Sequence, residues 1–162
     1  MTTSTASDQV SLLSQTGGDD LSSARRVLGI EANALNSLAE SLGENFILTI
    51  EVLSKIKGRV IISGMGKSGH IAKKIAATMA STGTPSFYVH PGEASHGDLG
   101  MITKEDAVLA LSNSGETTEL ADLIAYCKRF DIPLISMTSR KNSTLDTAAT
   151  ISFVLPPAPE AC

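Results

Sequence analysis

Residues 60–69 have the sequence VIISGMGKSG, in which a short β-branched run leads directly into a glycine-rich turn. Such a run, ended by glycines, is typical of a buried strand. Over residues 68–82 the apolar side chains recur at helical spacing, while Lys73, Lys74 and Thr78 fall on the other side. The stretch therefore predicts a strand, a tight turn and a helix that packs on a sheet.

Short apolar strands alternate with amphipathic helices on both sides of this stretch. We predict helices over 21–42, 45–56 and 117–130, strands over 86–89, 107–111, 133–137 and 151–155, and a long loop over 90–100. This alternation indicates βαβ crossovers and a parallel sheet that is covered on both faces. The predicted fold is a three-layer α/β/α sandwich with a mostly parallel, about five-stranded sheet, similar to flavodoxin. Ligands of such sheets bind outside the carboxyl ends of the strands.

The composition is that of one packed domain, with 162 residues of which 42% are hydrophobic. Residues 1–19 are rich in Ser, Thr, Gly and Asp, so we expect a flexible tail ahead of a single domain over 20–162. The formal charge of −4, without long runs of like charge, disfavours nucleic-acid binding. Neither a signal peptide nor a run of roughly 18 apolar residues is found, and two cysteines make no disulfide framework. We expect a cytoplasmic protein without a membrane segment.

The glycine-rich turn at 64–69 has the outline of a phosphate cradle. Its glycines let backbone N–H groups approach an anion, and the next helix presents its positive end. The turn also satisfies the GxGxxG pattern of dinucleotide folds, but the second strand ends in Val89-His90-Pro91-Gly92, without the acidic residue that binds ribose. A Walker loop fails because Ile61 stands where glycine is required. A tight turn without a ligand is the remaining alternative.

A second junction, SNSGETTE at residues 112–119, follows the predicted strand over 107–111 and opens a helix. Its hydroxyl and amide groups gather where the first N–H groups of a helix lack partners, an arrangement that suits a phosphoryl group. Ordinary capping by Ser114 is the alternative. Because capping needs only one of these polar residues, the series favours a phosphate site.

The predicted loop at 90–100, HPGEASHGDLG, contains two histidines and two carboxylates. Long ordered loops at the carboxyl edge of a sheet usually carry function. His90, Glu93 and His96 could ligate a metal, but their three-residue spacing is a weak signal, and we predict neither a metal nor another cofactor. A loop histidine more often serves as a hydrogen-bonding or acid–base group.

These motifs together resemble the SIS (sugar isomerase) domain of the bacterial D-arabinose-5-phosphate isomerases. The resemblance rests on GMGKSGH at 64–70, STGTPSF at 81–87, HPGEASHGDLGM at 90–101 and SNSGE at 112–116. It implies an enzyme that interconverts D-arabinose 5-phosphate and D-ribulose 5-phosphate through an enediolate, for octulosonate and lipopolysaccharide biosynthesis. It also implies that the protein binds a small-molecule sugar phosphate. The family's members form tetramers, so the resemblance implies a homo-oligomer.

The resemblance also implies roles for individual residues. Lys67, His96 and Glu119 match the family's catalytic positions. We expect Glu119 to carry the proton, Lys67 to stabilise the developing oxyanion and His96 to open the sugar ring or act as the second acid–base group, although the roles of Glu119 and His96 are exchangeable. The expected substrate-binding residues are Gly66, Ser68, Ser112, Asn113, Ser114 and Thr117. The structural alternatives are a helix-dipole partner for Glu119, a solvated cation for Lys67 and a loop-bracing hydrogen bond for His96.

The sequence departs from the family pattern at its C-terminal end. Family members continue past the position of Cys162 with a Thr-rich segment, a helix and a further catalytic histidine, and many then carry a pair of CBS domains. None of these follows in this sequence, so we expect the domain to be incomplete there. A sugar-phosphate-binding module without catalysis is the alternative function. The presence of Lys67, His96 and Glu119 favours the isomerase, because sensing a phosphate requires only the Ser/Thr junction.

Overall fold

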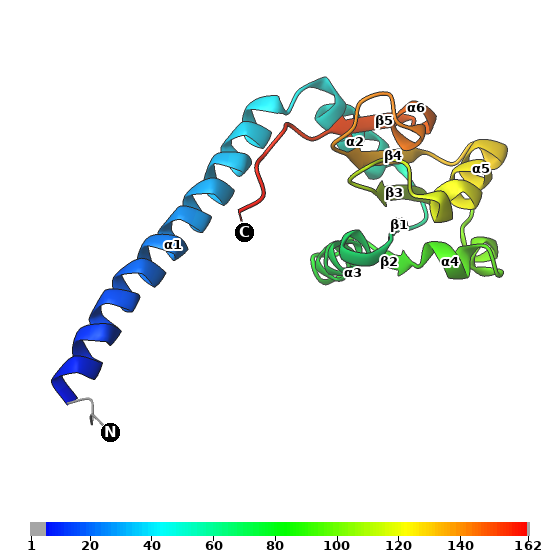
Figure 1. Cartoon of the computed structure of the whole chain (residues 1–162). Coiled ribbons are helices and arrows are strands. Elements are labelled where there is room, and N and C mark those ends of the chain that lie inside the picture. Colours follow the sequence, from blue (N-terminus) through cyan, green and yellow to red (C-terminus); the bar gives the residue numbers. More distant parts are fainter. Residues whose placement is uncertain (1–5, 162) are drawn as a thin grey trace. The chain divides into compact units, whose positions relative to one another are not determined.

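A parallel sheet of five strands forms the centre of residues 42–155 in this computed structural model, which describes residues 6–161. The strands are β1 (Val60–Gly64), β2 (Ser86–Val89), β3 (Ala107–Leu111), β4 (Leu134–Thr138) and β5 (Ile151–Val154). They lie in the order β2-β1-β3-β4-β5, and each neighbouring pair is parallel. The five-stranded parallel sheet expected from the sequence is confirmed (Figure 1).

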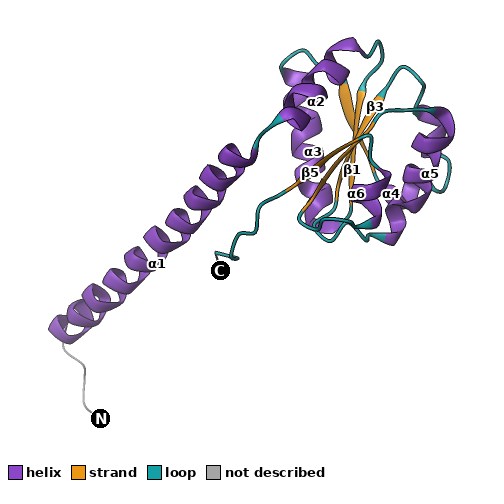
Figure 2. Ribbon diagram, turned by 90° about the horizontal axis from the view of Figure 1, so that it is seen from above, coloured by secondary structure: helices purple, strands orange, loops and turns teal. Residues whose placement is uncertain are grey.

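Helices cover both faces of this sheet (Figure 2). One face carries α2 (Glu44–Lys55) and α3 (Gly66–Ser81), and the other carries α4 (Pro91–Ala94), the 3-10 helices η1 (Asp98–Met101) and η2 (Thr118–Leu120), α5 (Ala121–Phe130) and α6 (Thr144–Ala148). Val60 and Ile62 of β1 are buried with Ala72 of α3, whereas Ile61 is buried with Leu123 of α5. This alternation follows from the two-residue period of a strand. The predicted three-layer sandwich is therefore confirmed.

The sequence patterns miss three short helical segments, α4, η1 and α6. α4 and η1 lie within or at the end of the predicted loop over 90–100, and α6 lies between β4 and β5. Each has only four or five residues, too few for a helical period to be visible in the sequence. α6 begins because the buried Ser143 accepts a hydrogen bond from Asp146 N through its Oγ atom, which caps the helix.

Helix α1 (Ala6–Ser41) belongs to a second unit of the chain, together with residues 156–161. The sequence predicts a flexible tail over 1–19, of which 1–5 lie outside the described residues, but from Ala6 onward the structure is helical. No proline interrupts residues 6–41, and an interior glycine costs a helix only about 1 kcal/mol, so a helix that has formed can extend through this polar stretch. None of the helices within 6–161 is long and apolar enough to cross a membrane.

The amino ends of β1 and β3 are joined by the buried carboxylate of Asp106, which is 1% exposed. It accepts hydrogen bonds from Arg59 N at 2.6 Å and Thr103 N at 2.8 Å, and Arg59 Nε lies 3.6 Å away. Burial raises the pKa of the Asp106 carboxyl, but the hydrogen bonds from Thr103 and Arg59 outweigh it, so the pKa lies below its ordinary value. The charged form is therefore part of the folded structure.

We expect Asp106→Asn to lower the free energy of unfolding by about 2 kcal/mol at pH 7, because it replaces charge-assisted hydrogen bonds in a buried position. The folded-state pKa lies below the ordinary value of 3.8, so the carboxylate stabilises the fold above that pH. Its contribution is lost as the pH falls through the lower folded-state pKa. Urea denaturation at pH 7 and at pH 3 measures both effects, and equal stability of the two proteins at pH 7 would contradict the assignment.

Candidate functional site

A small cavity of about 240 Å³ lies where the carboxyl ends of β3 and β4 meet the first turn of α3. Four predicted site residues line it: Lys67 and Ser68 from α3, and Ser112 and Asn113 from the junction after β3. The structure thus brings together the two loops that the sequence singles out for phosphate binding. Lys67 is exposed and Ser112 is buried, so the cavity has a charged rim and a hydroxyl at its base.

Close packing of two glycines brings these loops together. A Cβ atom on Gly64 would lie 3.0 Å from Leu111 O and 3.1 Å from Ser68 O. A Cβ atom on Gly69 would lie 2.6 Å from the carbonyl oxygen of Gly64. Cβ atoms rarely approach backbone atoms to 3.0 Å and essentially never to 2.6 Å, so glycine at both positions allows α3 to pack directly against the ends of β1 and β3.

The first turn of α3 presents a positive end to the cavity. Gly66 begins the helix with φ at 55°, in the left-handed region that favours glycine, and the next two residues line the cavity. The first N–H groups of a helix have no partners within the helix, and the helix dipole adds a partial positive charge there. Lys67 adds a full charge at the same place. This end of the cavity is suited to an anion.

Hydroxyl groups of the second junction bond to one another. Ser112 Oγ accepts a hydrogen bond from Gly115 N at 3.0 Å and lies 2.7 Å from Thr117 Oγ1. Because one hydrogen bond joins the two hydroxyls, one of their two protons remains available for a ligand. Ser114 Oγ accepts from Glu116 N at 3.2 Å, within the junction, so the alternative in which Ser114 caps the following helix is not what the structure shows.

Helix α6 supports this junction from behind. Gly115 has φ at 68°, and a Cβ atom there would overlap the side chain of Ser143. The Glu116 carboxylate accepts hydrogen bonds from Thr144 Oγ1 at 2.6 Å and Thr144 N at 3.1 Å, and these bonds hold its pKa below the ordinary value. Leu145 N donates to Gly115 O at 3.0 Å. The junction is therefore fixed by a helix that the sequence pattern did not predict.

The backbone of Asn113 is held in a similar way. Its carbonyl oxygen accepts hydrogen bonds from Ser139 Oγ at 2.7 Å, Ser139 N at 3.0 Å and Thr138 Oγ1 at 3.1 Å. All three donors lie at the carboxyl end of β4. The end of β4 therefore fixes the Asn113 backbone, and the exposed side chain is left to face the cavity that this residue lines.

The other predicted catalytic residues do not line this cavity. His96 is exposed between α4 and η1, and Glu119 is exposed in η2, where its carboxylate accepts a hydrogen bond from Thr118 Oγ1 at 3.1 Å. Gly66, Ser114 and Thr117 also lie outside its lining, although Thr117 is bonded to Ser112, which does line it. Of the three predicted catalytic residues, the cavity thus contains Lys67.

Four apolar residues complete the cavity wall: Ile71, Leu111, Met137 and Leu155. The sequence pattern assigned most of them to the interior, because they belong to the stripe of α3 or to the ends of strands. Ile71 is nevertheless 58% exposed. A strand-end position in a parallel sheet was the signal that could have placed Leu111 and Met137 beside this cavity.

The segment over residues 90–100, which we call the histidine loop, is held at its beginning by His90, the N-cap of α4. His90 Nδ1 accepts a hydrogen bond from Gly92 N at 3.1 Å, which corresponds to the hydrogen-bonding role that the sequence favours for a loop histidine. Among the residues that the structure describes, no group of three His, Cys, Asp or Glu side chains is placed to hold a metal ion.

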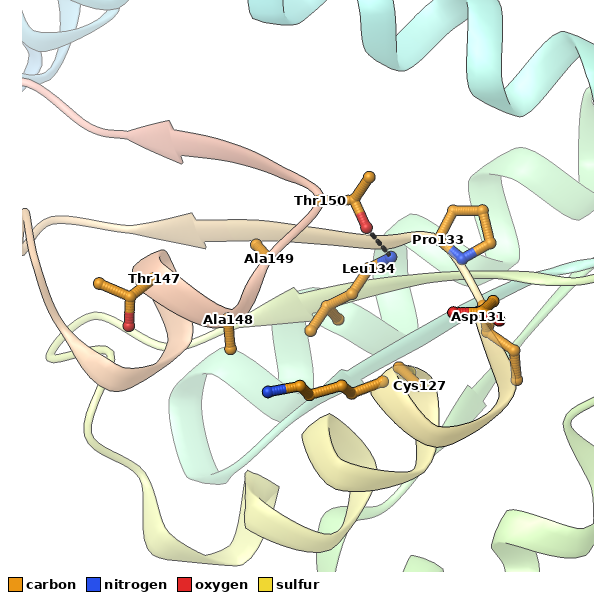
Figure 3. A pocket seen from close by; sticks show the side chains of 10 residues that line it. Cys127, Asp131, Pro133, Leu134, Thr147, Ala148, Ala149 and Thr150 are labelled. Atoms are coloured by element: carbon orange, nitrogen blue, oxygen red, sulfur yellow. Dashed lines mark hydrogen bonds between the residues drawn. The ribbon is translucent and has the colours of Figure 1, made fainter.

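A different cavity, of about 460 Å³, opens at the amino end of β4 near the C-terminal ends of α5 and α6 (Figure 3). None of the predicted site residues lines it. Helix C-terminal ends carry partial negative charge, which disfavours a phosphate. Burial raises the pKa of its Cys127 thiol to about 12, so this cysteine is protonated and unreactive at neutral pH. The cavity at the carboxyl ends of β3 and β4 remains the better candidate for a sugar phosphate.

Residues 52–162 match the family model of the SIS domain. The chain belongs to the SIS domain family. It is 55% identical over 144 residues to arabinose 5-phosphate isomerase KdsD of Pseudomonas aeruginosa, which covers 89% of this chain and 44% of that relative. It is 50% identical over 148 residues to KdsD of Escherichia coli K12, with 91% and 45% covered. The chain therefore spans under half the length of these relatives.

Solved structures support the SIS fold. The E. coli CFT073 protein c3406, in complex with arabinose 5-phosphate, has a TM-score of 0.84 and 41% identity, over 90% of this chain and 77% of that one. The sugar isomerase domain of the transcription factor RpiR from Sphaerobacter thermophilus has a TM-score of 0.67 and 17% identity, over 78% and 73%. The second similarity is one of fold alone. The predicted start of the SIS domain at residue 20 stays a prediction, because the family model begins at residue 52.

We expect Gly69→Ala to lower the free energy of unfolding by about 2 kcal/mol, because the added methyl group would overlap the Gly64 carbonyl in a packed site. Gly100→Ala is the matched control, since a Cβ atom there meets nothing within 4 Å and its φ is not in the left-handed region. Thermal and urea denaturation of both variants provide the measurement. Equal stabilities would show that α3 can move away from β1 without cost.

Proposed function

We propose that this SIS domain is an aldose–ketose isomerase that interconverts D-arabinose 5-phosphate and D-ribulose 5-phosphate. The observation that carries the proposal is the convergence of Lys67 and Ser68 with Ser112 and Asn113 on one cavity. Identities of about 50% to arabinose 5-phosphate isomerases, and the fold shared with an arabinose 5-phosphate complex, support this choice of substrate. The proposal concerns the whole reaction, whereas the chain spans under half the length of those relatives.

In this proposal the phosphate group lies between the α3 N-terminus and the second junction. The backbone near Gly66 and the hydroxyl of Ser68 donate from one side. Ser112, Asn113, Ser114 and Thr117 supply neutral donors from the other side. A phosphoryl dianion is stabilised by several donors and a helix end without a full set of countercharges. Lys67 is then free to act on the sugar and not only on the phosphate.

The reaction moves hydrogen between two neighbouring carbons of the open-chain sugar. A base removes the C2 proton, the electron pair forms a C1–C2 double bond, and negative charge develops on O1. Return of the proton to C1, with transfer of the O2 proton to O1, gives the ketose. We assign Lys67 to stabilise the oxyanion and Glu119 to carry the proton, with His96 for ring opening or as the second acid–base group. Glu119 follows Thr117 by two residues in the same junction.

We further propose that the chain forms a homo-oligomer, with the tetramer implied by the family resemblance. Large apolar side chains are exposed on α1 at seven-residue spacing: Leu21, Leu28 and Leu35, the last of them 66% exposed. α2 separately exposes Phe46, Ile47, Leu48 and Ile50. Helix faces of this kind are usually covered by another surface. Octulosonate and lipopolysaccharide biosynthesis and a cytoplasmic location stay predictions.

A specific observation keeps a second function open, namely sugar-phosphate sensing without catalysis. The same fold occurs in the sugar isomerase domain of a transcription factor, so the fold alone does not distinguish an enzyme from a sensor. The exposed positions of His96 and Glu119 outside the cavity lining are also compatible with a binding module.

Proton NMR of arabinose 5-phosphate in deuterium oxide with the 162-residue chain distinguishes the two functions. We expect ribulose 5-phosphate to form and the C2 proton signal to be lost. Lys67→Met should slow this exchange by about 100-fold or more, as expected for removing electrostatic stabilisation of an oxyanion. Lys74→Met, which changes an exposed lysine of the same helix outside the cavity, should leave the rate unchanged. Calorimetric binding of arabinose 5-phosphate without exchange or ketose would favour the sensor.

We expect Ser112→Ala to weaken arabinose 5-phosphate binding by about tenfold, because it removes a hydroxyl donor and frees Thr117 from its bonded position. Ser81→Ala provides the control, since this serine donates only to Thr78 O at the other end of α3. Isothermal titration calorimetry measures both dissociation constants. Unchanged affinity in Ser112→Ala would remove the second junction from the phosphate site.

A further inference from the structure

Two side chains at the end of β2, Tyr88 and His90, contact both loops of the proposed site. Tyr88 Oη donates a hydrogen bond to the carbonyl oxygen of Gly64 at 2.8 Å, where the glycine-rich loop begins. His90 Nδ1 accepts from Gly92 N at 3.1 Å, where the histidine loop begins. The two rings lie edge to face with their centroids 6.3 Å apart. The two adjacent rings therefore join the glycine-rich loop to the histidine loop.

The Tyr88 hydroxyl lies at the closest contact in the glycine-rich loop. A Cβ atom on Gly69 would lie 3.0 Å from Tyr88 Oη and 2.6 Å from Gly64 O, so these three groups pack directly against one another. Burial raises the pKa of Tyr88, which keeps the hydroxyl protonated as a donor. Lys73 Nζ lies over the ring, 5.0 Å from its centroid. Tyr88 thus fixes the carbonyl from which the chain turns toward Lys67 and Ser68.

His90 determines how the histidine loop leaves the sheet. Because Nδ1 accepts a hydrogen bond from a backbone N–H, the neutral ring carries its proton on Nε2. The backbone of the loop continues with Ala94 N donating to His90 O, and His96 N donating to Glu93 O, both at 2.9 Å. α4 has only four residues and cannot be stable by itself. Its shape, and the position of His96 two residues after it, therefore depend on the His90 cap.

We propose that Tyr88 and His90 are positioning residues that fix the glycine-rich loop and the histidine loop relative to each other. Neither side chain lines the cavity, so they act through Gly64 and Gly92. The inference rests on the proposed isomerase function and assigns each residue a separate effect. Tyr88 sets the affinity for the sugar phosphate, and His90 sets the rate of turnover.

Tyr88→Phe tests the first effect, because it keeps the ring and removes the donor to Gly64 O. We expect the dissociation constant for arabinose 5-phosphate to rise by about fivefold, with kcat nearly unchanged. Tyr126→Phe is a matched control, since Tyr126 Oη donates to Ile102 O at 3.0 Å on the other face of the sheet. Equal weakening by both variants would show only a general loss of stability and would overturn the role of Tyr88.

His90→Leu and His90→Asn test the second effect. Leu removes the acceptor for Gly92 N, whereas Asn retains an oxygen near the position of Nδ1 and is a good N-cap. We expect His90→Leu to lower kcat by about tenfold or more with little change in affinity, and His90→Asn to restore most of the rate. If His90→Asn is as impaired as His90→Leu, the cap is not the cause and the positioning role is overturned.

Two readouts remain informative even if the chain does not turn over. Nitrogen-15 NMR of His90 should show the Nε2–H form, and exchange of the Gly92 amide proton should accelerate in His90→Leu but not in His90→Asn. If the unsubstituted chain does not turn over but Tyr88→Phe still weakens binding of arabinose 5-phosphate, the isomerase function is contradicted. The positioning role of Tyr88 is then retained. Wild-type binding in Tyr88→Phe together with wild-type Gly92 exchange in His90→Leu would overturn the inference, whatever the activity.

Discussion

The contact between Gly69 and the carbonyl of Gly64 determines how closely α3 approaches the ends of β1 and β3. A side chain at either position would push the helix outward, because the neighbouring atoms belong to the backbone and cannot rotate away. With the helix in contact, Ser68 lies beside Leu111 and Ser112, and the cavity has two walls. The Tyr88 hydroxyl lies against the same pair of glycines, so the support of the histidine loop also begins at this contact.

The two edges of the sheet use different kinds of interaction. At the amino edge a charged carboxylate, Asp106, joins two strands through buried hydrogen bonds and an ion pair with Arg59. At the carboxyl edge, Ser112 bonds to Thr117, Asn113 O accepts from the end of β4, and the Glu116 carboxylate accepts from Thr144 of α6. Charge at the cavity is concentrated on Lys67 and the end of α3. No carboxylate lines the cavity beside them, which suits this cavity to an anion.

The layered fold, and the meeting of two junctions at one cavity, could be predicted from residues 60–69 and 112–119, because a buried strand followed by a polar or glycine-rich junction indicates both. The contacts that hold these junctions in place could not be predicted from the sequence. α6 shows no helical period in five residues, and the bonds from Thr144 to Glu116 join residues 28 positions apart. The role of Gly69 depends on the proximity of Gly64 O, which only the tertiary structure shows. The helical course of residues 6–19 was missed because composition alone does not report how far a helix extends.

The three hydrogen bonds to Asn113 O have a consequence for how such sites diverge. Since β4 holds this backbone through its carbonyl, the side chain at position 113 contributes nothing to keeping the loop in place. A different amino acid can occupy it while the surrounding frame is preserved. The side chain at this position can therefore change with the sugar that is bound, whereas Gly69 and Gly115, whose neighbours are fixed, allow no such change. Substrate range and foldability are therefore inherited through separate residues.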